Sequence, residues 1–283
     1  MIVVTGATGQ LGQLVIQALL RKLPASRIVA AVRQPEKATS LAALGVTVRQ
    51  ADYTQPASLD AAFQGAEKVL LISSSEVGQR LPQHRNVIDA AQRAGVQLLA
   101  YTSLLHADQS PLGLAEEHVA TEAYLAASGL PHVLLRHGWY TENYLASVPP
   151  ALQHGAFIGC AGEGRIASAS RADYAEADAA VLTLPDQAGK VYELAGDTAY
   201  TLTEFAAELS RQSGKAVPYV NLPEAEFKGA LVGAGLPEPL AGLLADSDSG
   251  AAQGGLFDGD RALSALIGRP TTPLAEMIAA ALR

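Results

Sequence analysis

The sequence predicts an α/β protein, with a Rossmann-like doubly wound parallel sheet and a smaller C-terminal α/β lobe. Strand-like and helix-like segments alternate five times between residues 2 and 101 through short connections, which is typical of a parallel sheet covered on both faces. The first strand also runs into a glycine-rich loop that opens a helix. We expect a first domain over residues 1–145 and a smaller, substrate-covering lobe over residues 146–283, with parts of 157–195 returning to the sheet.

The glycine-rich loop carries the strongest local signal. A β-branched run over residues 2–4 predicts a strand buried on both faces, and apolar residues follow at the spacing of one helix face. Between them, Gly6 permits a tight turn, Gly9 lets bare backbone approach a pyrophosphate, and Gly12 lets the helix pack closely on the sheet. The phosphates would lie against the free N–H groups of the first helical turn. An ordinary glycine-rich turn is the alternative, but the position between strand and helix favours a dinucleotide site.

The second predicted strand ends in a basic residue where the adenosine ribose is expected. Residues 27–33 form the second predicted strand, apolar over 28–32 and ending in Arg33, with Lys37 one turn beyond. An acidic residue there would bind the ribose 2′-hydroxyl of NAD, whereas a guanidinium suits a 2′-phosphate. A solvated charge at the strand end is the alternative for Arg33. The sequence therefore predicts NADPH as the preferred cofactor.

The rest of the first domain continues the alternation. Gly45 suits the C-cap of the second helix. Asp52 and Tyr53 follow the third strand and would lie near the adenine, although Asp52 suits a turn equally well. We expect helices over residues 38–44, 57–63, 83–93 and 114–128, and strands over residues 46–52, 68–72, 96–101 and 132–136.

Three serines follow the fourth predicted strand. Ser73, Ser74 and Ser75 stand at its carboxyl end, which is where ligands bind in a doubly wound sheet. Small polar residues there would let the backbone approach the nicotinamide ribose. A plain loop with an N-cap serine explains them equally well.

The second half no longer alternates regularly between strand and helix, and glycine and proline interrupt its short helix-like segments. The segment over residues 246–259 is rich in Asp, Ser and Gly, and we expect a mobile surface loop there. We also expect a glycine-rich loop over residues 155–164 and a strand over 190–194. A helix capped by Asp173 should run to about Leu182, and a second helix should run from the Thr201 capping box to Gly214. A final helix should start at Thr272-Pro273.

Composition narrows the class of protein. Hydrophobic residues make up 49% of the 283 residues and charged residues 17%, which indicates a well-filled core. A formal charge of −8 argues against nucleic acid or an anionic membrane as the main partner. Cys160 is the single cysteine, so we expect no internal disulfide and no metal site built from cysteines. The strand at residue 2 leaves no room for a signal peptide, and no apolar run reaches the ~18 residues of a membrane span, so we expect a soluble cytoplasmic protein.

The acid pair of ordinary short-chain dehydrogenases is missing. These enzymes use a Tyr with a Lys four residues later, and the expected positions hold Leu114 and His118. Hydride addition to a ketone builds an alkoxide, whose parent pKa is about 15.7, and therefore needs an acid. Hydride addition to a quinone builds a phenolate-like anion with a pKa of about 10, which can collect its proton from water. The sequence therefore favours quinone-like acceptors.

Several blocks along nearly the whole chain carry a specific resemblance. They are residues 5–12, 72–80, 101–108, 138–144, 170–174 and 256–258. With them the chain resembles the NmrA-like atypical short-chain dehydrogenase/reductases and, within that group, the bacterial type 2 NAD(P)H:quinone oxidoreductases. The resemblance implies two-electron reduction of quinones by NADPH through direct hydride transfer, without flavin. The expected partner is a small quinone, and a homodimer is left open.

The resemblance also implies the site. It makes Asn143 the catalytic residue of the nicotinamide and quinone pocket. One departure is His137, where Asn is expected; an imidazole can still donate a hydrogen bond there. The residues placed at the cofactor are Gly6, Ala7, Thr8, Gly9, Gln10, Leu11, Arg33, Ser73, Ser74, Ser75, His137, Gly138, Trp139, Tyr140 and Asn143.

The aromatic segment fits a flat ligand. Trp139, Tyr140 and Tyr144 suit stacking on such a ligand, with Asn143 as donor and acceptor among them. The alternative is that these rings fill the seam between the two lobes. Arg171 either reaches a phosphate or is a structural charge beside the Asp173 cap.

The six histidines lack close metal spacing. We expect His84, His118 and His154 on helix surfaces. His106 and His118 remain outside candidates for delivering a proton.

A second class of function shares the missing acid pair. Other NmrA-like proteins bind NADP without turnover and act as redox-sensing regulators through protein contacts. The aromatic segment with Asn143 favours the enzyme. Reduction of an activated double bond is a third alternative, for which the sequence offers no identifiable acid or base.

Overall fold

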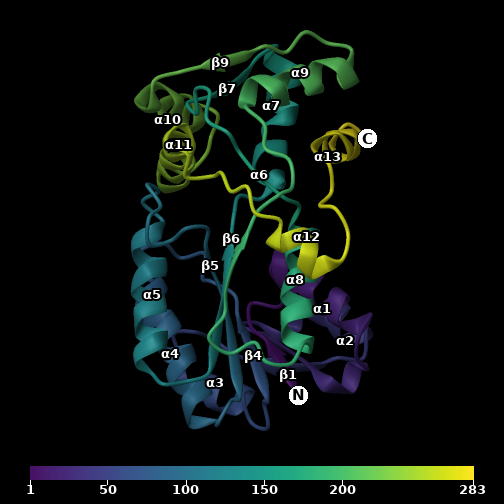
Figure 1. Cartoon of the computed structure of the whole chain (residues 1–283), viewed down its shortest axis with the longest axis vertical. Helices are drawn as coiled ribbons and strands as arrows, with labels where there is room; N and C mark the ends of the chain where they lie inside the picture. The colour runs from purple at the N-terminus through teal and green to yellow at the C-terminus, as the bar shows by residue number, and fades with distance from the viewer.

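The computed structural model describes all 283 residues, and it confirms the predicted Rossmann-like fold. Seven strands form one parallel sheet in the order β3-β2-β1-β4-β5-β6-β8 (Figure 1). These strands are β1 (Ile2–Val4), β2 (Ile28–Val32), β3 (Thr47–Gln50), β4 (Lys68–Leu71), β5 (Leu98–Leu104), β6 (His132–His137) and β8 (Val191–Leu194).

Helices cover both faces of this sheet, because successive strand residues point to opposite sides. Ile2 and Val4 belong to the core on one face, and Val3 belongs to the core on the other. The first face carries α1 (Gln10–Leu20), α8 (Arg171–Thr183) and α12 (Ala262–Ile267), with α2 (Thr39–Ala43) beside them. The second face carries α3 (Pro56–Ala62), α4 (Arg80–Arg93) and α5 (Ala115–Ala127). Two short 3₁₀ turns, η1 (Ala25–Arg27) and η2 (Pro35–Lys37), flank β2.

The strand order reverses at β1, which pairs with β2 on one side and β4 on the other. The loops that leave β1 and β4 therefore separate toward opposite faces of the sheet and leave a crevice between them. These two loops carry the glycine-rich segment and the three serines. The fold thus brings together the two sequence signals that lie far apart along the chain.

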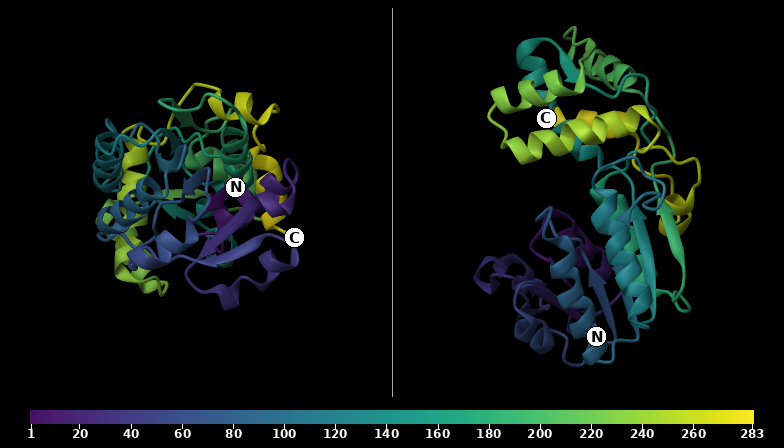
Figure 2. Two further views of the ribbon diagram at one scale, coloured as in Figure 1. Left: turned by 90° about the horizontal axis from the view of Figure 1, so that it is seen from below. Right: turned by 90° about the vertical axis from the view of Figure 1, so that its left-hand side faces the viewer.

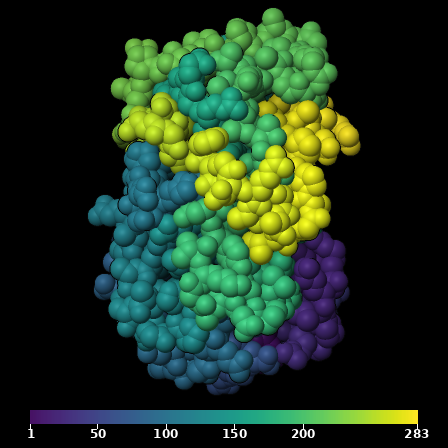
Figure 3. All heavy atoms as spheres, in the orientation of Figure 1, coloured from purple at the N-terminus to yellow at the C-terminus, as the bar shows by residue number.

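The remaining elements form a lobe beyond the carboxyl ends of the strands (Figures 1 and 2). Its core includes Trp139, Tyr144, Phe157 and Phe205. The space-filling view shows α11 (Glu238–Ala252, yellow-green) and α13 (Leu274–Ala281, yellow) at opposite sides of the lobe surface (Figure 3). No helix is long and apolar enough to span a membrane. The lobe elements are α6 (Thr141–Leu145), α7 (Val148–His154), β7 (Phe157–Gly159), α9 (Leu202–Ser213), β9 (Tyr219–Asn221), α10 (Glu224–Gly233), α11 (Glu238–Ala252) and α13 (Leu274–Ala281).

Two loop predictions in this half are wrong. Half of the expected mobile segment over 246–259 belongs to α11, and Asp248 within it is only 2% exposed. Its small residues allow close packing: a Cβ at Gly250 would lie 2.7 Å from the Leu112 side chain. The expected loop over 155–164 contains β7, which pairs with β9.

The start of α8 also differs from the prediction. Ser170, not Asp173, is the N-cap, and its hydroxyl accepts the N–H of Asp173. Asp173 lies inside the first turn, where it accepts two hydrogen bonds from Thr272 and forms an ion pair with Arg269 at 2.7 Å. The capping box of Thr201 and Glu204 on α9 is confirmed.

Candidate active site

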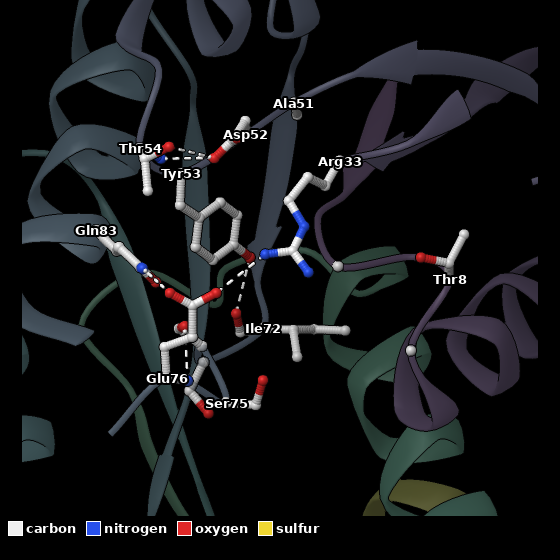
Figure 4. A pocket seen from close by; sticks show the side chains of 14 residues that line it. Thr8, Arg33, Ala51, Asp52, Tyr53, Thr54, Ile72, Ser75, Glu76 and Gln83 are labelled. Carbon is white, nitrogen blue, oxygen red and sulfur yellow. Dashed lines mark hydrogen bonds and ion pairs between the residues drawn. The ribbon is translucent and has the colours of Figure 1, made fainter. Parts of the chain in front are cut away.

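A pocket of about 290 Å³ opens in the crevice between the β1 and β4 loops (Figure 4). The ends of β2 and β3 and the start of α4 complete its walls. Seven residues predicted for the cofactor line it together: Gly6, Thr8, Gly9, Arg33, Ser73, Ser74 and Ser75.

The glycine loop has the geometry that a diphosphate needs. Gly6 has a φ of +59°, which favours glycine. A Cβ at Gly12 would lie 2.5 Å from the Gly6 oxygen and 2.7 Å from the Ala7 Cα, so only glycine lets α1 start this close to the loop. Gly9, the N-cap of α1, offers no side chain to the first helical turn. The N–H groups of that turn remain available to an anion.

Arg33 faces an acidic neighbour across the pocket. Its guanidinium lies 3.0 Å from the Glu76 carboxylate, and Gln83 donates to the other carboxylate oxygen at 2.8 Å (Figure 4). The sequence predicts no role for Glu76 or Gln83. Both come from the β4 loop and α4, and no local pattern indicates that they meet the end of β2.

The end of β3 supplies the wall next to Arg33. Asp52 accepts the N–H and hydroxyl of Thr54, at 2.9 and 2.7 Å. It therefore makes the turn and also lines the pocket, and its proximity to the adenine stays a prediction. The Tyr53 hydroxyl donates to the Ile72 carbonyl at 2.8 Å, which ties the end of β3 to the end of β4.

Buried side chains fix the backbone of the serine loop. The Ser73 N–H donates to Thr102 Oγ1 and the Ser74 N–H donates to His84 Nε2, both at 2.9 Å. The Ser74 carbonyl accepts from Arg80 Nε at 2.7 Å. These buried residues thus fix the backbone of the loop, and the three serines line the pocket.

The prediction that His84 and His118 lie on helix surfaces is wrong, because both are buried. Since His84 Nε2 accepts a backbone N–H, its proton must sit on Nδ1, from which it donates to Thr121 Oγ1 at 3.0 Å. Burial and the nearby Arg80 charge lower the pKa of His84 to about 3. The ring is therefore a neutral structural acceptor at neutral pH.

The positions of the missing acid pair hold no substitute acid. Leu114 is apolar, and burial with the Arg80 charge lowers the pKa of His118 well below its usual value. His118 Nδ1 lies 2.8 Å from the Tyr101 hydroxyl, and burial raises the pKa of that phenol. His106, the other candidate, lies 2.9 Å from Asp258.

The segment after β6 turns most of its rings inward. Trp139 and Tyr144 are 7% and 6% exposed and pack in the lobe core, as the seam alternative expects. His137 lies 2.8 Å from Asp178 and stacks on Tyr174 with ring centroids 4.6 Å apart. Its imidazole therefore faces α8.

Asn143 is held by a cation. Arg171 Nη2 donates to Asn143 Oδ1 at 2.7 Å, and the Arg171 guanidinium lies 4.6 Å from the centre of the Tyr140 ring. Because arginine only donates, this contact fixes which amide atom is oxygen. The Asn143 Nδ2 group is left as a donor with no protein acceptor. The sequence is compatible with two roles for Arg171, and in the structure its side chain lies beside Asn143.

Not all predicted residues line the 290 Å³ pocket. Ala7 and Leu11 are buried beneath the loop, and Gln10 is exposed at the start of α1. Four residues of the β6–α6 segment, His137 to Tyr140, and Asn143 also lie outside the set that lines this pocket. Their contact with the cofactor stays a prediction.

Comparisons with known proteins agree with this geometry. A family model described as NAD(P)H-binding matches residues 6–185. Quinone oxidoreductase 2 of Escherichia coli is 65% identical over 278 residues, which cover 98% of this chain and 97% of that protein. The crystal structure of the NADPH-dependent quinone oxidoreductase QOR2 from the same organism, complexed with NADPH, has a TM-score of 0.98 at 64% identity, with 100% of both chains covered. The structure of NmrA, a negative transcriptional regulator in complex with NAD, has a TM-score of 0.76 at 19% identity over 98% of this chain and 93% of that one, and shows the fold alone.

Proposed function

The chain belongs to the NmrA-like NAD(P)H-binding family, and on that premise we propose that it reduces quinones by direct hydride transfer from NADPH, without a flavin. The observation that carries the proposal is the pocket at the β1/β4 crevice, where the glycine loop, Arg33 and the three serines meet. The E. coli relative, 65% identical over nearly the full length of both chains, supports the quinone as acceptor.

The residues present fit NADPH. The uncapped first turn of α1 would hold the diphosphate, and Arg33 would hold the 2′-phosphate. The serine loop would carry the nicotinamide ribose, with its backbone fixed by His84 and Arg80. When bound, NADPH supplies the hydride, and the protein supplies position and a dry surface around the reacting atoms.

Asn143 would act at the quinone. Its Nδ2 donor is aimed by Arg171, which occupies the Oδ1 side of the amide. A quinone oxygen that gains negative charge during hydride transfer would accept from Nδ2, and the nearby guanidinium would favour that charge. The product anion has a pKa of about 10, so it leaves as a phenolate or takes a proton from water. The reaction would therefore need no acid at the positions of the acid pair, which hold the neutral His118 and the apolar Leu114.

The test is the oxidation of NADPH, followed at about 340 nm, by purified protein with a simple benzoquinone and no added flavin. We expect saturable turnover and a primary isotope effect with deuterated NADPH, because the hydride moves directly. The absorbance spectrum of the protein should contain no flavin bands. NADPH binding without turnover above the uncatalysed rate would contradict the proposal and favour the redox-sensing regulator.

A further inference from the structure

A second cavity, of about 520 Å³, lies beside the cofactor pocket. Its walls come from the β4 loop, the start of α5 and the first turns of α11, which Figure 1 shows above the loop before α5. We refer to it as the α11 groove. The lining residues that matter here are Ser75, Val77, Leu114, Pro237, Leu240 and Leu243.

The groove begins next to the cofactor pocket. Ser75 lines both the cofactor pocket and the α11 groove, so the two spaces share a wall. Leu114 also lines the groove, and it stands at the position where ordinary short-chain dehydrogenases place the phenol that faces the substrate carbonyl. A substrate whose carbonyl lies near this position therefore has the groove directly beside it.

The lining is apolar and carries little free charge. Val77 and Leu240 are 53% and 45% exposed, although both are hydrophobic. The one charged lining residue is Asp246, and its carboxylate already accepts the Gly113 N–H at 2.9 Å. No lysine, arginine or histidine lines the groove. Apart from Ser75 and Asp246, the lining residues are apolar or glycine, so the surface suits a hydrocarbon chain better than a charged substituent.

The walls are held in place before any ligand binds. The hydrogen bond from Gly113 to Asp246 joins the loop before α5 to α11. At the other end of α11, a Cβ at Gly250 or Gly255 would lie within 2.7 Å of the Leu112 side chain, so helix and loop are in close contact. Pro237 and Pro239 stiffen the entry to α11. A preformed apolar groove binds with less loss of conformational freedom than a mobile one.

We propose that the α11 groove binds the alkyl or prenyl chain of a quinone whose ring lies at the nicotinamide, so that tail-bearing quinones are the preferred substrate class. This inference rests on the proposed function. The chain would leave the ring beside Ser75 and Leu114 and lie along Val77 and Leu240. The reaction itself is unchanged: the ring gains a hydride and a proton, NADPH becomes NADP⁺, and the chain takes no part in bond making.

The experiment compares two quinones with the same dimethoxy-methyl ring, one without a tail and one with a decyl tail. We expect kcat/KM to be at least about tenfold higher for the decyl compound, since two buried methylenes alone account for that factor. The KM for NADPH should be the same with both. Micelle formation is excluded by working below the critical concentration of the decyl compound.

The variant Leu240→Asp tests the location. A carboxylate on the groove wall should lower kcat/KM for the decyl quinone at least about fivefold and leave the tail-free quinone unchanged. Leu44→Asp is the matched control, because Leu44 has the same 45% exposure and lies after α2, outside the groove. It should leave both values unchanged.

The outcomes separate the two proposals. Turnover of both quinones with equal kcat/KM would overturn the α11 groove as a tail site and leave the proposed function standing. No turnover of either would overturn the proposed function and, with it, this inference. If Leu240→Asp instead dissociates an oligomer in sedimentation and leaves the tail preference intact, the groove is an interface between copies and the inference is wrong.

Discussion

Arg33 and Glu76 form an ion pair with an N–O distance of 3.0 Å inside the pocket that carries the glycine loop. The cation predicted to bind the 2′-phosphate of NADPH therefore already has an anionic partner. Binding of NADPH in the proposed manner would require Arg33 to exchange this carboxylate for the phosphate, or to bridge the two. Glu76 would then lie close to a second negative charge, so in this proposal the pair would set how strongly the protein prefers NADPH over NADH.

Arg33→Asp should weaken NADPH binding far more than NADH binding. We expect the dissociation constant of NADPH to rise at least about tenfold, because a charge-assisted bond to phosphate is lost and a repulsion is added. Isothermal titration with both cofactors measures this. Arg27→Asp, at the opposite end of β2 in an ion pair with Glu67, is the control. Equal losses for both cofactors would remove Arg33 from the 2′-phosphate site.

Glu76→Gln should act in the opposite direction. The substitution keeps the size of the side chain and frees Arg33 for the phosphate. We expect the dissociation constant of NADPH to fall about threefold and that of NADH to change little, because only NADPH brings a charge to this place. The gain should shrink at high salt. Weaker NADPH binding would show that Glu76 contributes to the site rather than opposing it.

Asn143→Asp should lower kcat/KM for quinones by about ten- to a hundredfold. The new carboxylate keeps the acceptor for Arg171 but removes the Nδ2 donor and adds a charge that repels the developing phenolate. Steady-state kinetics with a simple benzoquinone measures the loss. In the control Asn221→Asp, the side-chain acceptor for Gly162 and Tyr219 is likewise kept, and activity should be unchanged. Full activity of Asn143→Asp would exclude an oxyanion role.

Gly12→Ala should disrupt the diphosphate loop. The added methyl would lie 2.5 Å from the Gly6 oxygen, so loop and helix must separate at a cost of about 1–3 kcal/mol in the free energy of unfolding. NADPH binding should be lost or strongly weakened. Gly229→Ala in α10, where nothing lies within 4 Å of the added carbon, should instead stabilise the protein by about 0.5–1 kcal/mol. Thermal unfolding and titration of both variants test the difference.

His84 should make the folded protein sensitive to acid. Its pKa is about 3 in the fold and about 6.5 in an unfolded chain, so the unfolded chain binds more protons between these values. Its contribution to stability is therefore complete above pH ~6.5 and falls as the pH drops toward 3, by up to about 1.4 kcal/mol per pH unit.

The test of this sensitivity is urea unfolding between pH 7 and 4.5 for wild type and His84→Gln. The amide can accept from Ser74 but does not titrate, so the variant should lose about 2 kcal/mol less than wild type over that range. His154→Gln, on the exposed end of α7, should follow wild type. Parallel losses in wild type and His84→Gln would show that this imidazole does not control the acid response.

The elements of the sheet could be predicted from the sequence because each depends on a short pattern. A β-branched run next to a glycine loop predicts β1 and α1, and the small residues of the loop predict its close packing. Prediction from short sequence patterns was wrong where small polar residues pack against residues that are distant in the sequence. The residues 246–259 have the composition of a loop, yet half of them form the end of α11. Gly250 packs closely against Leu112 there, and Tyr144 and Cys160 hydrogen-bond to Asp248.

The residues of the candidate site also fall into two groups: those that the sequence predicts and those whose contacts only the structure shows. The sequence by itself determined the glycine loop, Arg33 and the serines, because a strand end followed by a turn fixes where each lies in a doubly wound sheet. Only the tertiary structure decided that Glu76 faces Arg33, that His84 is a buried acceptor for Ser74 and that Arg171 orients Asn143. These relations join residues from different elements. The partner, charge state and direction of a side chain depend on which elements meet in space, and no spacing along the chain encodes that meeting.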